Sequence, residues 1–244
     1  MEPVTALPVF AFSDLDDTLF QSPRRRDPGA GAIVAALDME GQPGSFQCMR
    51  QQAFFALLQN TSTVIPVTAR STRALSRVLL PFSSWRIASG GAVLLQPDGQ
   101  EDPEWREISQ ARVHSVLPLF QAVVNEVDQL LAASGCAERC RILEDLGRPV
   151  YLVVKRSEGS TFPTEFRKLP VDPRLQRWIT GENLVYAAAD VTKRDAVQFL
   201  LDHRLPKERL ALGFGDSPMD QGFLEICDYA GWPAINPYAR WSAP

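Results

Sequence analysis

Short apolar runs alternate with helical patterns at both ends of the chain. Near the start, an apolar run at 9–12 is followed by a helical pattern over 46–58 and a second apolar run at 63–67. Near the end, a helical pattern over 193–203 precedes an apolar run at 210–214. This alternation is typical of a mostly parallel sheet with helices packed on its faces, so we expect an α/β protein.

The middle of the chain differs from its two ends. Pro97, Asp98, Gly99 and Pro103 mark a composition change that indicates a linker. A long helical pattern follows at 109–133, and its interior proline favours a kink or a break. After the linker we therefore expect a second structural unit.

Several shorter elements complete this middle block. Strands are expected at 141–146, 150–155 and 184–188, and a helix is expected near 173–180. The simplest arrangement is a Rossmann-like core with a parallel sheet, assembled from residues 1–96 and 187–244. Residues 97–186 are then inserted as an α+β cap domain.

Composition restricts the partners. The net charge of −4 gives no overall attraction to nucleic acid, and no apolar run is long enough to span a bilayer. Of the four cysteines only Cys136 and Cys140 are close in sequence, so reduced structural thiols are expected rather than a zinc site. We expect a cytoplasmic protein, as a monomer or homodimer, with neither nucleic acid nor membrane as a partner.

An acidic turn follows the first apolar run. Asp14, Asp16, Asp17 and Thr18 place carboxylates and a hydroxyl where an open α/β sheet binds ligands, at the carboxyl end of a strand. Clustered carboxylates repel one another, and a hard cation such as Mg²⁺ would relieve that repulsion. The alternative is an ordinary acidic turn that caps a helix.

The turn also carries the pattern D-x-D-x-T, in which the sequence resembles the haloacid dehalogenase-like superfamily. The resemblance implies that Asp14 is a nucleophile that forms an aspartyl-phosphate. It implies that Asp16 is the general acid and base, which protonates the leaving oxygen and then activates water. Asp17 stands where the family commonly has glycine, so the shape of the turn is in question.

Two further segments resemble the phosphate-binding motifs of this superfamily. Thr68 and Ala69 lie in V-T-A-R, which is similar to the T-G-R of the Cof-like sugar phosphatases. Lys193 begins a helical pattern after Thr192, in the first turn, where the helix dipole disfavours a lysine unless an anion lies close by. The resemblance implies that Thr68, Ala69 and Lys193 hold phosphate.

The fourth motif is G-D-x-x-x-D after the last strong strand. Here the resemblance implies that Asp216 binds the metal, together with Asp14 and the backbone carbonyl of Asp16. Asp220 would hold a metal-bound water or fix Lys193. The local pattern offers a compatible structural role, because Ser217, Pro218 and Asp220 form a good helix start.

Together these motifs imply an enzyme of the Cof-like subgroup with a large α/β cap between motifs II and III (type IIB). Met219 and Gly90 stand where such proteins have asparagine. The expected reaction is magnesium-dependent hydrolysis of a small phosphorylated metabolite, a sugar phosphate by resemblance. A phosphomutase and a non-catalytic ligand-binding or partner-binding protein remain as alternatives.

Outside the motifs, basic residues at 24–26 follow the acidic turn and could attract an anionic substrate, although such runs usually face solvent. Lys155 and Arg156 precede a loop of the cap that could cover a substrate.

Overall fold

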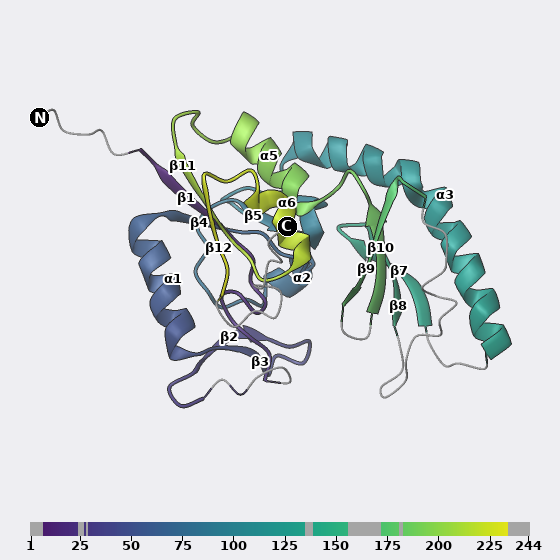
Figure 1. The fold of residues 1–244 in the computed structure, drawn as a ribbon, viewed down its shortest axis with the longest axis horizontal. Coiled ribbons are helices and arrows are strands. Elements are labelled where there is room, and N and C mark those ends of the chain that lie inside the picture. Colours follow the sequence, from purple (N-terminus) through teal and green to yellow (C-terminus); the bar gives the residue numbers. More distant parts are fainter. Residues whose placement is uncertain are drawn as a thin grey trace, which may run out of the picture. The chain divides into compact units, whose positions relative to one another are not determined.

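The computed structural model of the chain describes residues 7–23, 27, 29–134, 139–155, 172–180 and 183–233 (Figure 1). Contacts divide the chain into two compact units. Unit 1 combines Met1–Trp105 with Lys193–Pro244, and unit 2 is Arg106–Thr192. The chain therefore passes from one unit to the other after Trp105 and returns at Lys193, whereas the sequence suggested boundaries at 97 and 187.

Unit 1 is built on a parallel sheet. Its strands are β1 (Val9–Ser13), β4 (Thr63–Pro66), β11 (Leu210–Phe214) and β12 (Tyr229–Gly231), in the order β12-β11-β1-β4. Every neighbouring pair is parallel, and β1 lies between β11 and β4. The α/β class predicted from the alternating pattern is confirmed.

Side chains of the central strands are buried on both faces of this sheet. Ala11 pairs with Val64 and Phe12 with Ile65, and all four are buried. Successive side chains of a strand point to opposite faces, so the two pairs belong to different faces. Ala11 and Val64 share an apolar cluster with residues of α1 (Met49–Thr61), which therefore packs on one face.

A short antiparallel hairpin precedes α1. Strands β2 (Ile33–Leu37) and β3 (Pro43–Gln47) pair with each other, so the helix expected from residue 46 begins only at Met49. The prediction was wrong at its start because the apolar Phe46 belongs to the strand. The described residues of unit 1 form three further helices, which are α2 (Thr72–Leu75), α5 (Lys193–His203) and α6 (Pro218–Leu224).

A tight turn joins β5 (Arg86–Ala88) to β6 (Val93–Leu95) through the 3₁₀ turn η1 (Ser89–Gly91). Gly90 has φ 64° and ψ 23°, in the left-handed region that glycine and asparagine adopt most readily. Glycine in place of the family's asparagine therefore suits this turn.

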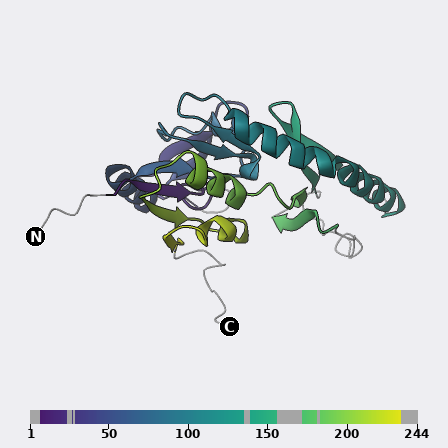
Figure 2. The same cartoon turned by 90° about the horizontal axis from the view of Figure 1, so that it is seen from above.

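The described residues of unit 2 form a long helix and an antiparallel sheet. Helix α3 (Pro103–Ser134) begins in unit 1 and continues without a break through Pro118. The strands are β7 (Arg139–Asp145), β8 (Arg148–Lys155), β9 (Leu175–Thr180) and β10 (Asn183–Ala188), in the order β7-β8-β10-β9. The second half of α3 runs along one side of this sheet (Figures 1 and 2), and Phe120, Val127 and Leu152 are fully buried.

The helix expected near residues 173–180 is a strand instead. β9 pairs with β10 along its whole length, from Leu175 opposite Ala188 to Thr180 opposite Asn183. The tertiary pairing overrides the weak helical pattern of this segment. Arg156 and the loop at 157–164 lie outside the described residues.

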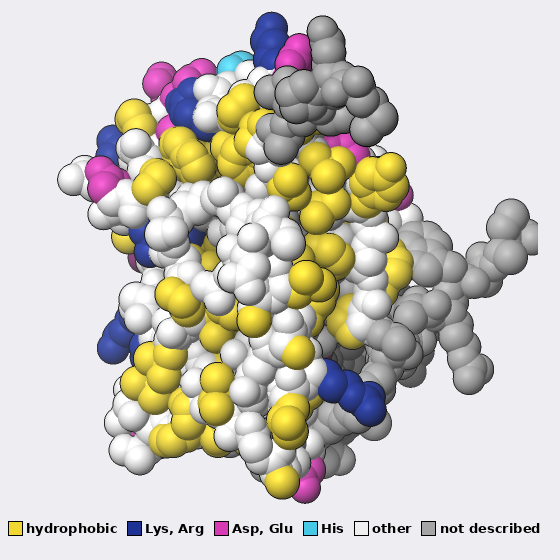
Figure 3. All heavy atoms as spheres, turned by 90° about the vertical axis from the view of Figure 1, so that its left-hand side faces the viewer, with side chains coloured by type: hydrophobic (Ala, Val, Ile, Leu, Met, Phe, Trp, Pro, Cys, Tyr) yellow, Lys and Arg dark blue, Asp and Glu magenta, His cyan; other side chains and the backbone are white. Residues whose placement is uncertain are grey.

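Hydrophobic side chains are scattered over the face on the left-hand side of Figure 1, and most charged side chains there lie near its edges (Figure 3). Exposed large hydrophobic residues of unit 1 include Ile33, Met39, Met49 and Leu57. Among the described helices, none is both long enough and apolar enough to cross a membrane.

Candidate active site

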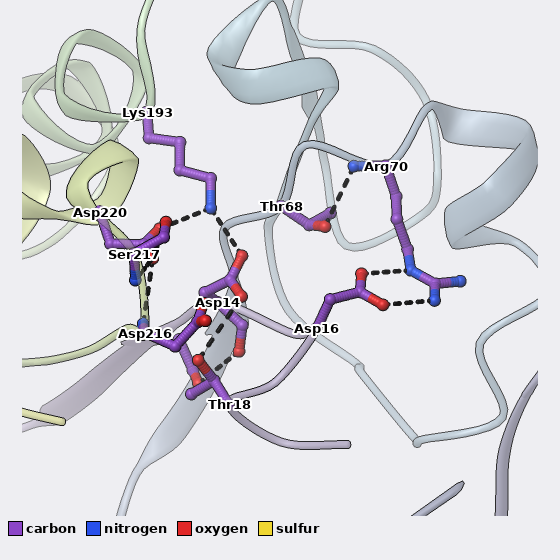
Figure 4. A network of polar contacts seen from close by, with 10 residues as sticks. Asp14, Asp16, Thr18, Thr68, Arg70, Lys193, Asp216, Ser217 and Asp220 are labelled. Carbon is purple, nitrogen blue, oxygen red and sulfur yellow. Dashed lines mark hydrogen bonds and ion pairs between the residues drawn. The ribbon is translucent and has the colours of Figure 1, made fainter. Parts of the chain in front are cut away.

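The carboxyl ends of three parallel strands bring the candidate residues together. Asp14 follows β1 directly, and its amide donates to the carbonyl of Phe214 at the end of β11, at 2.8 Å. On the other side of β1, the amide of Val67 donates to the carbonyl of Ser13 at 2.8 Å. Thr68 and Asp216, which follow β4 and β11, therefore lie at the same edge of the sheet as Asp14 (Figure 4).

Lys193 contacts two of the acids. Its Nζ lies 2.6 Å from Oδ1 of Asp14 and 2.6 Å from Oδ1 of Asp220. Burial alone would lower the pKa of Lys193, but these two carboxylates hold it well above its ordinary value. The lysine at the start of α5 thus has anions beside it, which offsets the unfavourable helix dipole.

Asp220 is fully buried and uses both carboxylate oxygens. While Oδ1 accepts from Lys193, Oδ2 accepts from the amides of Asp216 at 3.1 Å and Ser217 at 2.9 Å, and from the Ser217 hydroxyl at 2.8 Å. Ser217 is the N-cap of α6, and Pro218 follows it. Asp220 therefore caps α6 and fixes Lys193 at the same time.

Gly215 allows this arrangement. A Cβ atom at this position would lie 2.4 Å from Cβ and 2.8 Å from Cγ of Asp220. Both distances are far below van der Waals contact, so any side chain here would displace Asp220. The glycine before Asp216 is therefore required for close approach rather than for a special backbone angle.

Carboxylate oxygens of Asp14, Asp216 and Asp220 lie within 4.8 Å of one another. Burial raises the pKa of the Asp14 carboxyl well above its usual range; Lys193 opposes this shift, and the charges of Asp220 and Asp16 add to it. A cation would relieve this repulsion, and oxygen donors are the ligands that Mg²⁺ prefers. Both oxygens of Asp220 accept the hydrogen bonds that fix Lys193 and the start of α6, so Asp220 suits a supporting role in this cluster.

The carboxylate of Asp16 lies apart from this cluster. It is half exposed and forms a two-pronged ion pair with Arg70, in which Nε lies 2.6 Å from Oδ2 and Nη2 lies 2.7 Å from Oδ1 (Figure 4). Arg70 is the last residue of V-T-A-R, and the sequence alone predicted no role for it. The arginine that V-T-A-R shares with T-G-R was the signal that could have identified it.

Thr68 and Ala69 form the turn after β4. Thr68 is buried, and its Oγ1 accepts from the amide of Arg70 at 3.1 Å, whereas Ala69 is exposed. Thr18 lies on the other side of Asp14, with its Oγ1 3.5 Å from Asp14 Oδ2.

Asp17 adopts φ 62° in the acidic turn, so the left-handed conformation that glycine favours is present without glycine. Aspartate in place of the family's glycine is therefore accommodated at this position of the turn.

Two other groups of residues lie outside this arrangement. Residues 24–26 and Cys136 are not among the described residues. Cys48, Cys140 and Cys227 are free thiols, and burial raises the pKa of Cys140 and of Cys227 to about 12. These two thiols are therefore protonated at neutral pH, as expected of structural cysteines.

No protein-family model matches the sequence, and no curated protein matches it either. Several solved structures are similar. The sucrose-phosphatase of Synechocystis sp. PCC6803 is 17% identical, covers 90% of this chain and 80% of its own, and gives a TM-score of 0.55. A phosphatase of the haloalkanoate (HAD) superfamily from Bacteroides thetaiotaomicron is 12% identical, with coverages of 95% and 94% and a TM-score of 0.50.

A third similar structure is the IMP-nucleotidase of Plasmodium falciparum. It is 12% identical and gives a TM-score of 0.58, and the match covers 94% of this chain and 65% of that one. At these identities the similarity concerns the fold. The chain has the fold of the haloacid dehalogenase-like superfamily, as the motifs predicted.

Proposed function

We propose that the protein is a magnesium-dependent phosphatase that hydrolyses a small phosphate monoester through an aspartyl-phosphate on Asp14. The observation that carries the proposal is the buried Lys193, whose Nζ lies 2.6 Å from both Asp14 and Asp220 at the carboxyl edge of a parallel sheet. This arrangement puts a nucleophilic carboxylate next to a fixed cation, where the charge of a phosphate can be neutralised.

In the proposed reaction, an oxygen of Asp14 attacks phosphorus and the ester oxygen leaves with a proton from Asp16. Water, deprotonated by Asp16, then releases phosphate and regenerates Asp14. Lys193, the Thr68 hydroxyl and the amide of Ala69 would hold the phosphate oxygens. The fold, which the chain shares with phosphatases, supports this assignment of roles.

A magnesium ion would be held by Asp14, Asp216 and the backbone carbonyl of Asp16, with Asp220 in support. When bound, it would neutralise charge on the transferring phosphoryl group and lower its repulsion from Asp14. The residues suit such an ion because carboxylate oxygens of Asp14, Asp216 and Asp220 lie within 4.8 Å of one another. Asp220 then contributes by holding Lys193 and the start of α6.

Sugar phosphates are the proposed substrate class, because the similar structures include a sucrose-phosphatase and a trehalose-6-phosphate phosphatase domain from C. albicans. Unit 2 is the proposed cap, inserted between Trp105 and Lys193, and it would select the substrate. The IMP-nucleotidase among the similar structures makes nucleoside monophosphates the class to test beside sugar phosphates.

The test is phosphate release from 4-nitrophenyl phosphate, sugar phosphates and nucleoside monophosphates in magnesium buffer. Asp14→Asn should abolish release, and excess EDTA should abolish it in wild type. Asp202→Asn changes an exposed acid in the same helix as Lys193 and should leave the activity unchanged. Circular dichroism verifies that Asp14→Asn is folded.

Release that persists in Asp14→Asn or in EDTA would refute the proposed mechanism. A wild-type protein that releases no phosphate from any substrate would refute the phosphatase assignment. An isomerised sugar phosphate in place of free phosphate would identify a phosphomutase.

A further inference from the structure

Asp16 points away from the lysine and toward Arg70 (Figure 4). Two nitrogens of the guanidinium contact two oxygens of the carboxylate, at 2.6 and 2.7 Å. This two-pronged geometry fixes the plane of the carboxylate as well as its position, which a single contact from a lysine could not do.

Arg70 is itself held by its surroundings. Its Cζ lies 4.9 Å above the centre of the Phe20 ring, and its Nη2 lies 3.3 Å from Oγ of Ser45 on β3. Its backbone amide donates to Thr68 Oγ1 at 3.1 Å. The side chain of Arg70 is 18% exposed, whereas that of Asp16 is 47% exposed. Arg70 is therefore the fixed partner, and Asp16 takes its orientation from it.

Stability alone does not explain this pair. Ion pairs with an exposed partner contribute about 0–1 kcal/mol, because solvent screens them. Asp16 instead follows Asp14 in the same acidic turn, and Arg70 shares the β4–α2 turn with Thr68. The position of the pair suits control of where the Asp16 carboxylate lies relative to a phosphate on Asp14.

We propose that Arg70 is a positioning residue that sets the orientation of the Asp16 carboxylate for proton transfer to the leaving oxygen. This inference rests on the proposed phosphatase function and adds a residue to it. Arg70 acts through Asp16, so its effect depends on how much the leaving group needs a proton.

The test compares two leaving groups by kcat/KM, which reports the steps up to phosphoryl transfer to Asp14 and excludes the later attack by water. An alkyl phosphate such as a sugar phosphate needs a proton on its leaving oxygen, whereas 4-nitrophenyl phosphate barely does. In Arg70→Ala, kcat/KM should fall about 10–100-fold for the sugar phosphate, a fraction of the usual general-acid contribution. It should fall less than about 3-fold for the nitrophenyl ester, where that contribution is small.

Three further comparisons test for an indirect effect. Arg70→Lys keeps the charge but not the two-pronged contact. Its kcat/KM should again fall more for the sugar phosphate than for the nitrophenyl ester, but by less than in Arg70→Ala. Arg73→Ala removes an exposed arginine three residues further along and should change neither value. In an Asp16→Asn background, adding Arg70→Ala should change kcat/KM less than about 2-fold, since the group it positions is absent.

Equal losses for both leaving groups, or a further loss in the Asp16→Asn background, would overturn the role of Arg70 while leaving the phosphatase assignment intact. Activity that survives in Asp14→Asn would overturn the proposed mechanism and this role together. The two failures are therefore distinguished by which variant shows them.

Discussion

Asp220→Asn tests the hydrogen-bond network that fixes the lysine. Asp220 is fully buried, and every contact of its carboxylate described here comes from a donor: Lys193 at Oδ1, and the groups of Asp216 and Ser217 at Oδ2. An asparagine has an NH₂ group at one end. Whichever way the amide is turned, this group meets either the ammonium of Lys193 or the backbone N–H groups.

The cost can be estimated from these contacts. Removing one partner of a buried ion pair lowers the free energy of unfolding by about 3–5 kcal/mol. The loss here should lie at the lower end, because Lys193 keeps Asp14 at 2.6 Å and because the acidic cluster loses one of its repelling charges. We expect the free energy of unfolding to fall by about 3 kcal/mol.

Urea unfolding at neutral pH in metal-free buffer, followed by circular dichroism, measures this change. The control is Glu225→Gln at the other end of α6, where the pair with Arg194 is about half exposed and 3.3 Å long. Losing this ion pair should lower the free energy of unfolding by less than about 1 kcal/mol. If Asp220→Asn stays within about 1 kcal/mol of wild type as well, the two oxygens of Asp220 do not face donors, and this network does not fix Lys193.

Two further predictions concern unit 1. Arg204 contacts Asp102 at 2.8 and 3.1 Å, so Asp102→Asn should lower the free energy of unfolding by about 2 kcal/mol at neutral pH. Burial would raise the pKa of Asp102, but hydrogen bonds from Arg204 and the Trp105 amide hold it below 3.8; this stability is present above about pH 4 and is lost as the pH falls through the lowered pKa. The difference between the unfolding curves of wild type and Asp102→Asn should therefore shrink from neutral to acidic pH. A difference that grows on acidification would contradict the assignment. Gly215→Ala should lower the free energy of unfolding by about 1–3 kcal/mol and reduce kcat, because it displaces Asp220. The control is Gly222→Ala, whose Cβ would lie 3.2 Å from Cβ of Arg194 and which should melt close to wild type. Equal melting temperatures for the two variants would argue against the close approach of Gly215 to Asp220.

The convergence of Asp14, Thr68 and Asp216 could be predicted from sequence because it depends on topology. Residues that follow parallel strands reach one edge of the sheet whatever their side chains do. The start of α6 could also be predicted from the sequence, because Ser217, Pro218 and Asp220 follow the local rules of helix capping. The fold class followed from the same alternating pattern.

Other features depend on contacts that no local pattern encodes. The pairing of Arg70 with Asp16 joins residues 54 positions apart, and Ser45, which supports it, lies on a hairpin that was not expected. Strand β9 was read as a helix because its identity comes from its partner β10 rather than from its own composition. Pro118 likewise suggested a break, yet α3 continues through it.

The two points where the chain crosses between the units define where the inserted domain could be exchanged for another. The ion pairs of Arg204 with Asp102 and Glu104 belong entirely to unit 1, and that of Arg112 with Asp190 belongs entirely to unit 2. A chimaera that replaces residues 106–192 with another inserted domain would leave these contacts of unit 1 in place. The graft must end directly before Lys193, so the junction itself would have to supply a good helix start, and an error of one residue there would turn the lysine away from Asp14.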